Sequence, residues 1–271
     1  MLGGDGEATE AVRLADLAAM RLLDQPGDAE KYLRQALSCG DGVLPAEHLA
    51  RLSSQLVMVM SGQQGREREL AAAAQEAAAR WTGISAADTV HLTFVAARAL
   101  HRAGEHAAAV TAFAGPIGSG EAPYPPMEMA LVFGQYGRSL KLLGRHREAA
   151  GQFLEGERLV QAEPGQAEMQ AELAWSAATA LDSCGEDDQA QVVYLRAARL
   201  WGALGQVSKR ARCIRSAAWL QHWASPATSG GPTAMRALLD ELEQLERAAP
   251  SPAVRTELTY TRRQLVEMEG Q

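Results

Sequence analysis

One spacing of glycine, alanine and an aromatic residue occurs three times in the middle of the chain. In each copy the alanine follows the glycine by five residues, and the aromatic residue follows the alanine by four. The glycines lie 40 and 41 residues apart, a period typical of stacked helix pairs. The repeat therefore predicts an array of antiparallel helix pairs. Its three copies are Gly104, Ala109 and Phe113; Gly144, Ala149 and Phe153; and Gly185, Ala190 and Tyr194.

Each residue type of this triplet has a physical reason to occur at its position. A glycine at the turn can adopt positive φ, so one helix can end and its partner begin within a few residues. The alanine lets the second helix approach the first closely, and the aromatic ring fills the seam with the neighbouring pair. A single pair cannot bury its apolar side alone, so stability is expected to come from stacking.

Apolar residues recur at helical spacing along nearly the whole chain, and no strand pattern with period two is evident. We therefore expect an all-α fold, a right-handed α-solenoid of about six helix pairs plus a terminal helix, forming one domain over 1–271. Loops are expected where Pro and Gly cluster, at 115–126 and 225–232. Helices are expected at about 8–23, 28–39, 45–61, 65–82, 206–224, 233–248 and 252–269, with pairs around Gly104 and at about 127–163 and 166–204.

Charge and cysteine content narrow the class of protein. A net charge of −7 and a pI near 5.5 argue against direct nucleic-acid binding, which needs a basic face. The three cysteines are far apart and form no CxxC pair, which indicates a reducing compartment. No signal peptide and no run of 18 apolar residues is evident, so we expect a cytoplasmic protein that does not bind membranes.

The sequence offers little for catalysis. The glycines 115, 118 and 120 resemble a phosphate loop only faintly, because neither a preceding strand nor a GK[ST] ending is present. No histidine spacing suggests three converging zinc ligands, and no nucleophile elbow occurs. A reactive role for Cys213, beside Arg212 and Arg215, is the weaker alternative to a buried small residue. We expect no catalytic residue, no metal and no cofactor.

The best-defined unit resembles the tetratricopeptide repeat (TPR) family, whose pattern is a bulky residue, an apolar–Gly pair, and then Gly, Ala and an aromatic residue. The resemblance is clear over about 87–204 and is weaker in the outer two copies, where Ala178 replaces a glycine and Pro116 interrupts the second helix. A HEAT-type repeat is the alternative, but the triplet favours the TPR family. The matching residues are Phe133, Tyr136, Gly137, Leu140, Gly144, Ala149 and Phe153.

The resemblance to the TPR family implies a binding function. TPR proteins typically bind peptides or partner proteins, and versions with a period near 40 resemble regulatory and sensor repeat proteins of bacteria. The variant of the family that grips a chain terminus depends on paired Asn residues. Since this chain contains no Asn, that variant is excluded in its usual form.

A second stripe on the first helix of each pair is expected to point into the concave side. It is found ten, six and three residues before each turn glycine. Aromatic and cationic residues mixed along a groove would suit an extended peptide or a helix of acidic or amphipathic character. The alternative is that these are ordinary residues of amphipathic helices, with the Trp rings buried between pairs. The predicted partner-binding residues are Phe94, Arg98, His101, Arg138, Lys141, Trp175, Thr179, Asp182, Arg215, Trp219 and His222.

The cationic segment 209–215 contains four charges within seven residues. A solvated helix face and a contact with an acidic partner are the two interpretations. The terminal helix 252–269 is expected to cap the array through Leu258, Leu265 and Met268, or else to pair with another copy as a homodimer.

These features together predict a non-catalytic scaffold or adaptor that captures a protein or peptide segment on its concave face. The alternative is a sensor or regulatory module that binds a signal peptide or small ligand and controls an associated effector.

Overall fold

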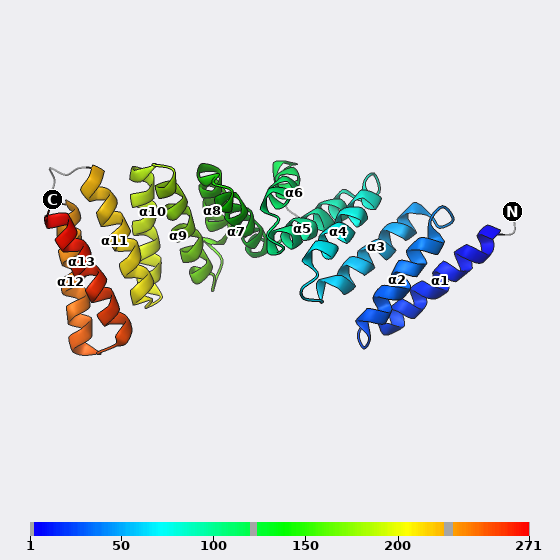
Figure 1. Ribbon diagram of the computed structural model, residues 1–271, viewed down its shortest axis with the longest axis horizontal. Helices are drawn as coiled ribbons and strands as arrows, with labels where there is room; N and C mark the ends of the chain where they lie inside the picture. The colour runs from blue at the N-terminus through cyan, green and yellow to red at the C-terminus, as the bar shows by residue number, and fades with distance from the viewer. Residues whose placement is uncertain (1–2, 120–123, 225–229, 271) are drawn as a thin grey trace. The chain divides into compact units, whose positions relative to one another are not determined.

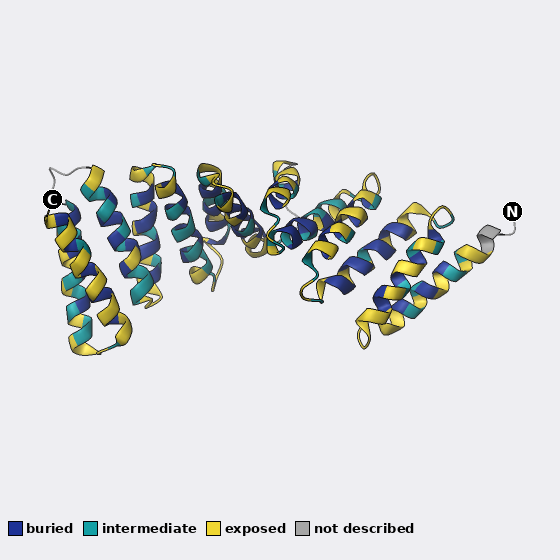
Figure 2. Ribbon diagram, viewed as in Figure 1, coloured by how far each residue is buried: buried dark blue, intermediate teal, exposed yellow. Residues whose placement is uncertain are grey.

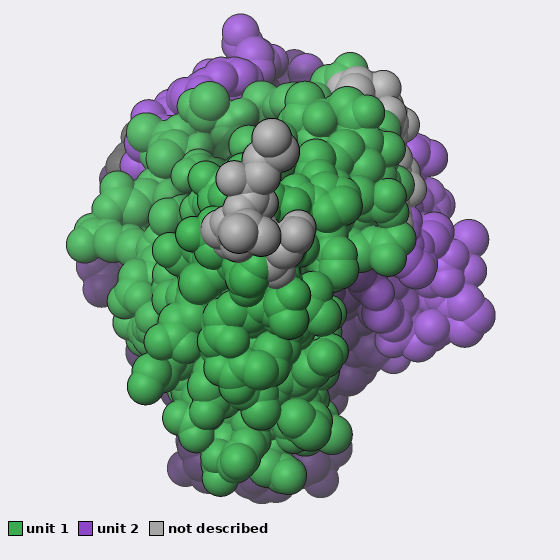
Figure 3. Space-filling model, turned by 90° about the vertical axis from the view of Figure 1, so that its right-hand side faces the viewer, with its two compact units in different colours: residues 1–123 green, residues 124–271 purple. Residues whose placement is uncertain are grey.

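The computed structural model describes residues 3–119, 124–224 and 230–270. These residues form thirteen α-helices and contain no β-strand. The chain divides into two compact units, unit 1 (Met1–Pro123) and unit 2 (Tyr124–Gln271), shown in different colours in Figure 3. The all-α prediction is confirmed, whereas the prediction of one domain over 1–271 remains a prediction.

Unit 1 contains three helix pairs, each consisting of two helices joined by a short connection (Figure 1). Successive helices pack against each other throughout the unit, within pairs and between them. Their bounds are α1 (Gly3–Arg21), α2 (Pro26–Gly40), α3 (Ala46–Ser61), α4 (Glu67–Trp81), α5 (Ala86–Arg102) and α6 (His106–Ser119).

Unit 2 contains three further pairs and one additional helix (Figure 1). Here too each helix packs on the next, so buried residues run along the sides where helices face each other (Figure 2). The bounds are α7 (Pro126–Leu142), α8 (His146–Val160), α9 (Ala167–Ser183), α10 (Asp187–Ala203), α11 (Val207–Ala224), α12 (Gly230–Ala248) and α13 (Pro252–Glu269).

The turn glycines have the backbone conformation that the triplet predicts. Gly104, Gly144 and Gly185 have φ of +78°, +75° and +75°. The residue after each glycine donates its N–H to a carbonyl five residues earlier, as Arg145 does to Leu140 at 2.9 Å. This bond defines a Schellman turn, which satisfies a helix carbonyl that would otherwise lack a partner.

The other two triplet positions form the core. The alanines at 109, 149 and 190 are fully buried, and the aromatic residues at 113, 153 and 194 are at most 2% exposed. Gly137 on α7 shows how tight the pairing is, because a Cβ there would lie 2.8 Å from the Phe153 ring on α8. The TPR-like apolar–Gly position is therefore required by contact with the aromatic ring of its own pair.

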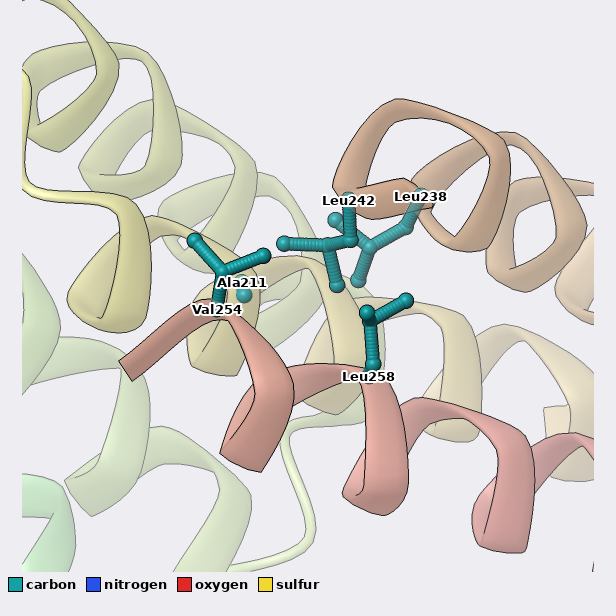
Figure 4. Packing of buried hydrophobic residues seen from close by; sticks show 5 residues of the cluster. All are labelled: Ala211, Leu238, Leu242, Val254 and Leu258. Carbon is teal, nitrogen blue, oxygen red and sulfur yellow. The ribbon is translucent and has the colours of Figure 1, made fainter. Parts of the chain in front are cut away.

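The terminal helix α13 covers the predicted range and packs on α11 and α12. Leu258, Leu265 and Met268 are all buried there, so its apolar side is used within the chain. A homodimer through this helix remains a prediction and would have to use exposed residues such as Tyr260 and Val266. Figure 4 shows one of the two clusters that hold it, formed by Ala211, Leu238, Leu242, Val254 and Leu258.

The predicted loops are shorter than expected. Residues 115–119 belong to α6, which continues through Pro116. Proline removes only one helix hydrogen bond here, in the last turn, and the ring is itself buried. Residues 230–232 begin α12, where Pro232 lies in the first turn and its missing N–H costs little. Residue 126 begins α7, and 120–123 and 225–229 lie outside the described residues.

Candidate functional site

The eleven predicted binding residues lie on the first helices of the pairs. Phe94, Arg98 and His101 are in unit 1, and the other eight are in unit 2. The buried residues of α11 repeat those of α9 after 40 positions. Examples are Ala171 and Ala211, Leu173 and Cys213, and Ala177 and Ala217.

In α5 and α7 the residue ten positions before the turn glycine does not point into a concave side as predicted. Phe94 is fully buried, and its ring centroid lies 6.5 Å from that of Phe113 on α6. It therefore belongs to the core of unit 1 and cannot contact a partner. Gly134, the equivalent residue of α7, is also buried, and a Cβ there would lie 3.3 Å from Leu173 on α9. In these two helices the position lies in the seam between neighbouring helices, whereas Trp175 at the same position of α9 is half-buried.

Arg215 is the second correction among the predicted residues. It is 8% exposed, and its guanidinium donates to the Glu257 carboxylate at 2.5 Å. The guanidinium also lies 5.6 Å from the centroid of the Tyr260 ring. Both partners are on α13, which covers this part of α11. Arg215 therefore joins two helices of unit 2 and is unavailable to a partner.

Two predicted residues from neighbouring pairs of unit 2 contact each other. Lys141 of α7 donates from Nζ to Thr179 Oγ1 of α9 at 3.1 Å, across 38 residues of chain. Arg138, one turn earlier on α7, is exposed, and its Nε donates to the carbonyl of Gly134 at 3.2 Å.

Trp175 lies beside a pocket of about 120 Å³ formed by α9, α10 and α11. Trp201 is 1% exposed, and the Lys209 ammonium lies 4.0 Å from the centroid of its ring. Lys209 also donates to Glu172 at 2.6 Å, so an ion pair and a cation–π contact hold it in place. The lining residues are Glu172, Trp175, Trp201, Lys209 and Arg212.

These contacts define one surface. Glu172, Trp175 and Thr179 share a side of α9, because helical residues spaced by three, four or seven lie one above another. The contact of Thr179 with Lys141 joins this side to α7, and the Glu172–Lys209 pair joins it to α11. We call this surface the α7–α9–α11 face; it comprises Arg138, Lys141, Glu172, Trp175, Thr179, Lys209 and Arg212.

The cationic segment 209–215 is neither a uniformly solvated face nor a free cationic patch. Lys209 pairs with α9, Arg210 with Glu241 on α12, and Arg215 with α13. Three of its four cations therefore bind neighbouring helices to α11. Arg212 is exposed and has no carboxylate partner among the described residues.

Sequence reasoning missed Glu172, Trp201 and the role of Lys209. A usable signal was present, since Glu172 and Lys209 carry opposite charges and lie 37 residues apart, close to one repeat. The same spacing joins Arg68 to Glu105, and a spacing of 39 joins Arg147 to Glu186. Opposite charges one repeat apart therefore mark contacts between neighbouring pairs.

Asp182 forms a hydrogen bond within unit 2. Its carboxylate accepts a hydrogen bond of 3.1 Å from the buried Tyr194 hydroxyl of α10. Burial and the nearby Asp182 charge both raise the pKa of Tyr194, so the hydroxyl stays protonated and can donate.

Trp219 and His222 lie toward the end of α11. Trp219 packs on a second buried cluster, which consists of Ala218, Met235, Leu265 and Met268. Its ring centroid is 5.9 Å from that of the half-exposed Trp223. The His222 ring is 5.6 Å from Trp223. This aromatic group is separate from the contacts that define the α7–α9–α11 face.

In unit 1, Arg98 lines a groove of about 620 Å³ together with Arg102 and residues of the α3–α4 connection. His101 is half-buried, with its ring centroid 5.7 Å from that of His106 across the turn.

No protein-family model matches the chain, and no curated protein sequence matches it either. No helix among the described residues is long and apolar enough to cross a membrane.

Solved structures do resemble it. The kinesin light chain TPR-like repeats from Podosopora anserina have a TM-score of 0.51 at 14% identity, covering 73% of this chain and 97% of their own. The apo form of RapI has a TM-score of 0.52 at 11% identity, covering 95% and 99%. A signal transduction ATPase with a tetratricopeptide repeat sensor from Pyrococcus horikoshii has a TM-score of 0.52 at 10% identity, covering 95% of this chain and 40% of its own.

Identities this low describe the fold alone. The described residues form helices that pack in succession, in agreement with the fold of these structures. The chain is therefore an all-α solenoid protein with a TPR-like repeat fold.

Proposed function

We propose that the protein is a non-catalytic scaffold that binds an acidic peptide or protein segment on the α7–α9–α11 face. The observation that carries the proposal is the charge of this face within an acidic chain. Four of its seven residues are cationic and Glu172 is acidic, whereas the whole chain has a net charge of −7. Glu168 and Asp182 lie on the same side of α9, but their carboxylates contact Lys209 and Tyr194 of this unit. Arg138, Lys141 and Arg212 have no carboxylate partner among the described residues, so their charge is available to a ligand.

The shape of the surface supports an extended ligand. Its cations belong to two first helices, α7 and α11, with Trp175 and Thr179 of α9 between them. Stacked repeats present such extended surfaces, and acidic segments would be attracted to them before contact. Because exposed charges are screened by salt, the attraction should weaken as ionic strength rises.

The proposal is tested by affinity capture from the native host with mass spectrometry, using the wild type and an Arg138→Glu/Lys141→Glu double variant. Arg199→Glu is the matched control, because Arg199 is exposed on α10 and its Nε also donates to the carbonyl four residues earlier. Circular dichroism checks that helicity is unchanged in both.

The wild type and the control should capture the same partner, which the double variant should lose. A synthetic peptide of the acidic segment of that partner should bind the double variant at least tenfold more weakly than the wild type. Its affinity for the wild type should fall as the salt concentration is raised. If the double variant keeps every partner, the binding surface lies elsewhere on the molecule.

A further inference from the structure

We propose that the pocket at Trp175 binds one aromatic ring of the ligand, with a carboxylate next to that ring placed against Arg212. The inference rests on the proposed function, because it names the anchor residue that an acidic segment would place on the α7–α9–α11 face. Such a ligand contains a Phe or Tyr side chain beside an acidic residue.

The size of the pocket fits a single ring. Its volume is about 120 Å³, and four of its five lining residues belong to the α7–α9–α11 face. A protein cavity of about 150 Å³ holds one benzene molecule. The pocket is therefore close in size to one phenyl group.

The walls of the pocket suit an aromatic guest. Two indole rings line the pocket: Trp201 is almost fully buried, and Trp175 is half-buried. The apolar stem of Lys209 is fixed by the ammonium contacts with Trp201 and Glu172. These side chains are already ordered before a ring binds, so little conformational entropy would be lost on binding.

Charge decides which kind of ring is favoured. The Lys209 ammonium lies 2.6 Å from Glu172 and 3.7 Å from Glu168, so the charge of this lysine is already neutralised. Arg212 remains as the lining cation without a carboxylate partner among the described residues. A ring that carries a carboxylate is therefore favoured over a neutral one, and a cationic ring is disfavoured because Lys209 already occupies Glu172.

The test uses phenylacetate, a single ring with one carboxylate, as the probe. The full chain is labelled with 5-fluorotryptophan and titrated while its ¹⁹F resonances are recorded. Benzyl alcohol and phenethylamine serve as neutral and cationic counterparts. The chain has five tryptophans, and Trp81 in unit 1 is an internal reference far along the chain from the pocket.

Phenylacetate should shift the resonances of Trp175 and Trp201 and leave that of Trp81 unchanged, with a Kd on the order of 1 mM. Benzyl alcohol and phenethylamine should bind at least fivefold more weakly. Arg212→Gln should weaken phenylacetate binding about tenfold, and Arg199→Gln should not change it. Trp175→Ala should abolish the response of Trp201, and Trp175→Phe should restore binding.

Three results would overturn the inference: no shift at saturating phenylacetate, a preference for phenethylamine, or equal affinity in Arg212→Gln. None of them bears on the proposed function, which is measured separately by partner capture with the Arg138→Glu/Lys141→Glu variant. If that variant keeps its partner while phenylacetate binds as described, the pocket is a ligand site and the acidic-segment scaffold is wrong.

Discussion

Arg215 of α11 and Glu257 of α13 form an ion pair of 2.5 Å in which both residues are at least nine-tenths buried. The pair connects the last helix of unit 2 to the first helix of the preceding pair. A buried charge that loses its partner is costly, whereas replacing both charges by apolar groups is often neutral.

Glu257→Ala should therefore lower the free energy of unfolding of unit 2 by about 3–5 kcal/mol, because Arg215 would be left buried and unpaired. Urea unfolding followed by circular dichroism measures the loss. The double variant Arg215→Met/Glu257→Leu is the control and should recover most of it. A loss in the double variant as large as in the single one would show that packing, and not charge, dominates this contact.

A methyl group at Gly137 should be destabilising because it would lie 2.8 Å from the Phe153 ring. We expect Gly137→Ala to cost about 1–3 kcal/mol. Gly151→Ala, on the exposed side of α8 with no atom within 4 Å of the added Cβ, should instead stabilise by about 0.5–1 kcal/mol. Thermal melts of the two variants should move in opposite directions.

Unit 1 should lose stability in acid through Glu30 of α2. Its carboxylate accepts both terminal nitrogens of Arg66, at 2.7 and 3.0 Å, and further bonds from Arg34 and Gln63. These partners, Arg66 above all, lower the pKa of Glu30 from 4.5 to about 2. The unfolded chain therefore binds the proton more tightly, and the stabilisation is complete above about pH 4.5 and lost as the pH falls toward 2.

The expected loss is about 1–3 kcal/mol over that range. Urea unfolding at several pH values, followed by the ¹⁹F signal of fluorinated Trp81, reports on unit 1 alone. Glu30→Gln should be less stable at pH 7 and should show a flatter dependence on acid. An equally steep dependence in that variant would assign the effect to other carboxylates.

Cys213 should be inert in the folded protein. Its side chain is fully buried, and burial raises the pKa of the thiol to about 12. Only the thiolate reacts with iodoacetamide, so at pH 8 the partly exposed Cys39 and Cys184 should be alkylated first. Peptide mass spectrometry should find Cys213 modified only after urea is added. Modification at the same rate as Cys184 would contradict this packing.

The fold was predictable because the triplet residues act within one pair. The positive φ of Gly144 and the burial of Ala149 and Phe153 depend on contacts between helices joined by a single short turn. Such contacts leave a short-range pattern that repeats along the chain, so spacing alone identifies them.

The candidate site was only partly predictable because its residues depend on helices further away. The same register position is buried by Phe113 at residue 94 and by α13 at residue 215, but borders a pocket at Trp175. These different outcomes are set by the size and charge of neighbours that the repeat pattern does not specify. Lys209 looked like one member of a cationic run, whereas its role depends on Glu172 in the preceding pair.

The contacts of α9 with α7 and with α11 restrict where the chain can gain or lose residues. Glu172 reaches Lys209 and Thr179 reaches Lys141 from the same side of one helix. Deleting one residue between them would turn one end relative to the other by about 100°, and both links could not survive. The connection 161–166 lies between α8 and α9, so a change in its length does not alter the helical phase within α9. Natural insertions and deletions should therefore accumulate there and be absent from α9.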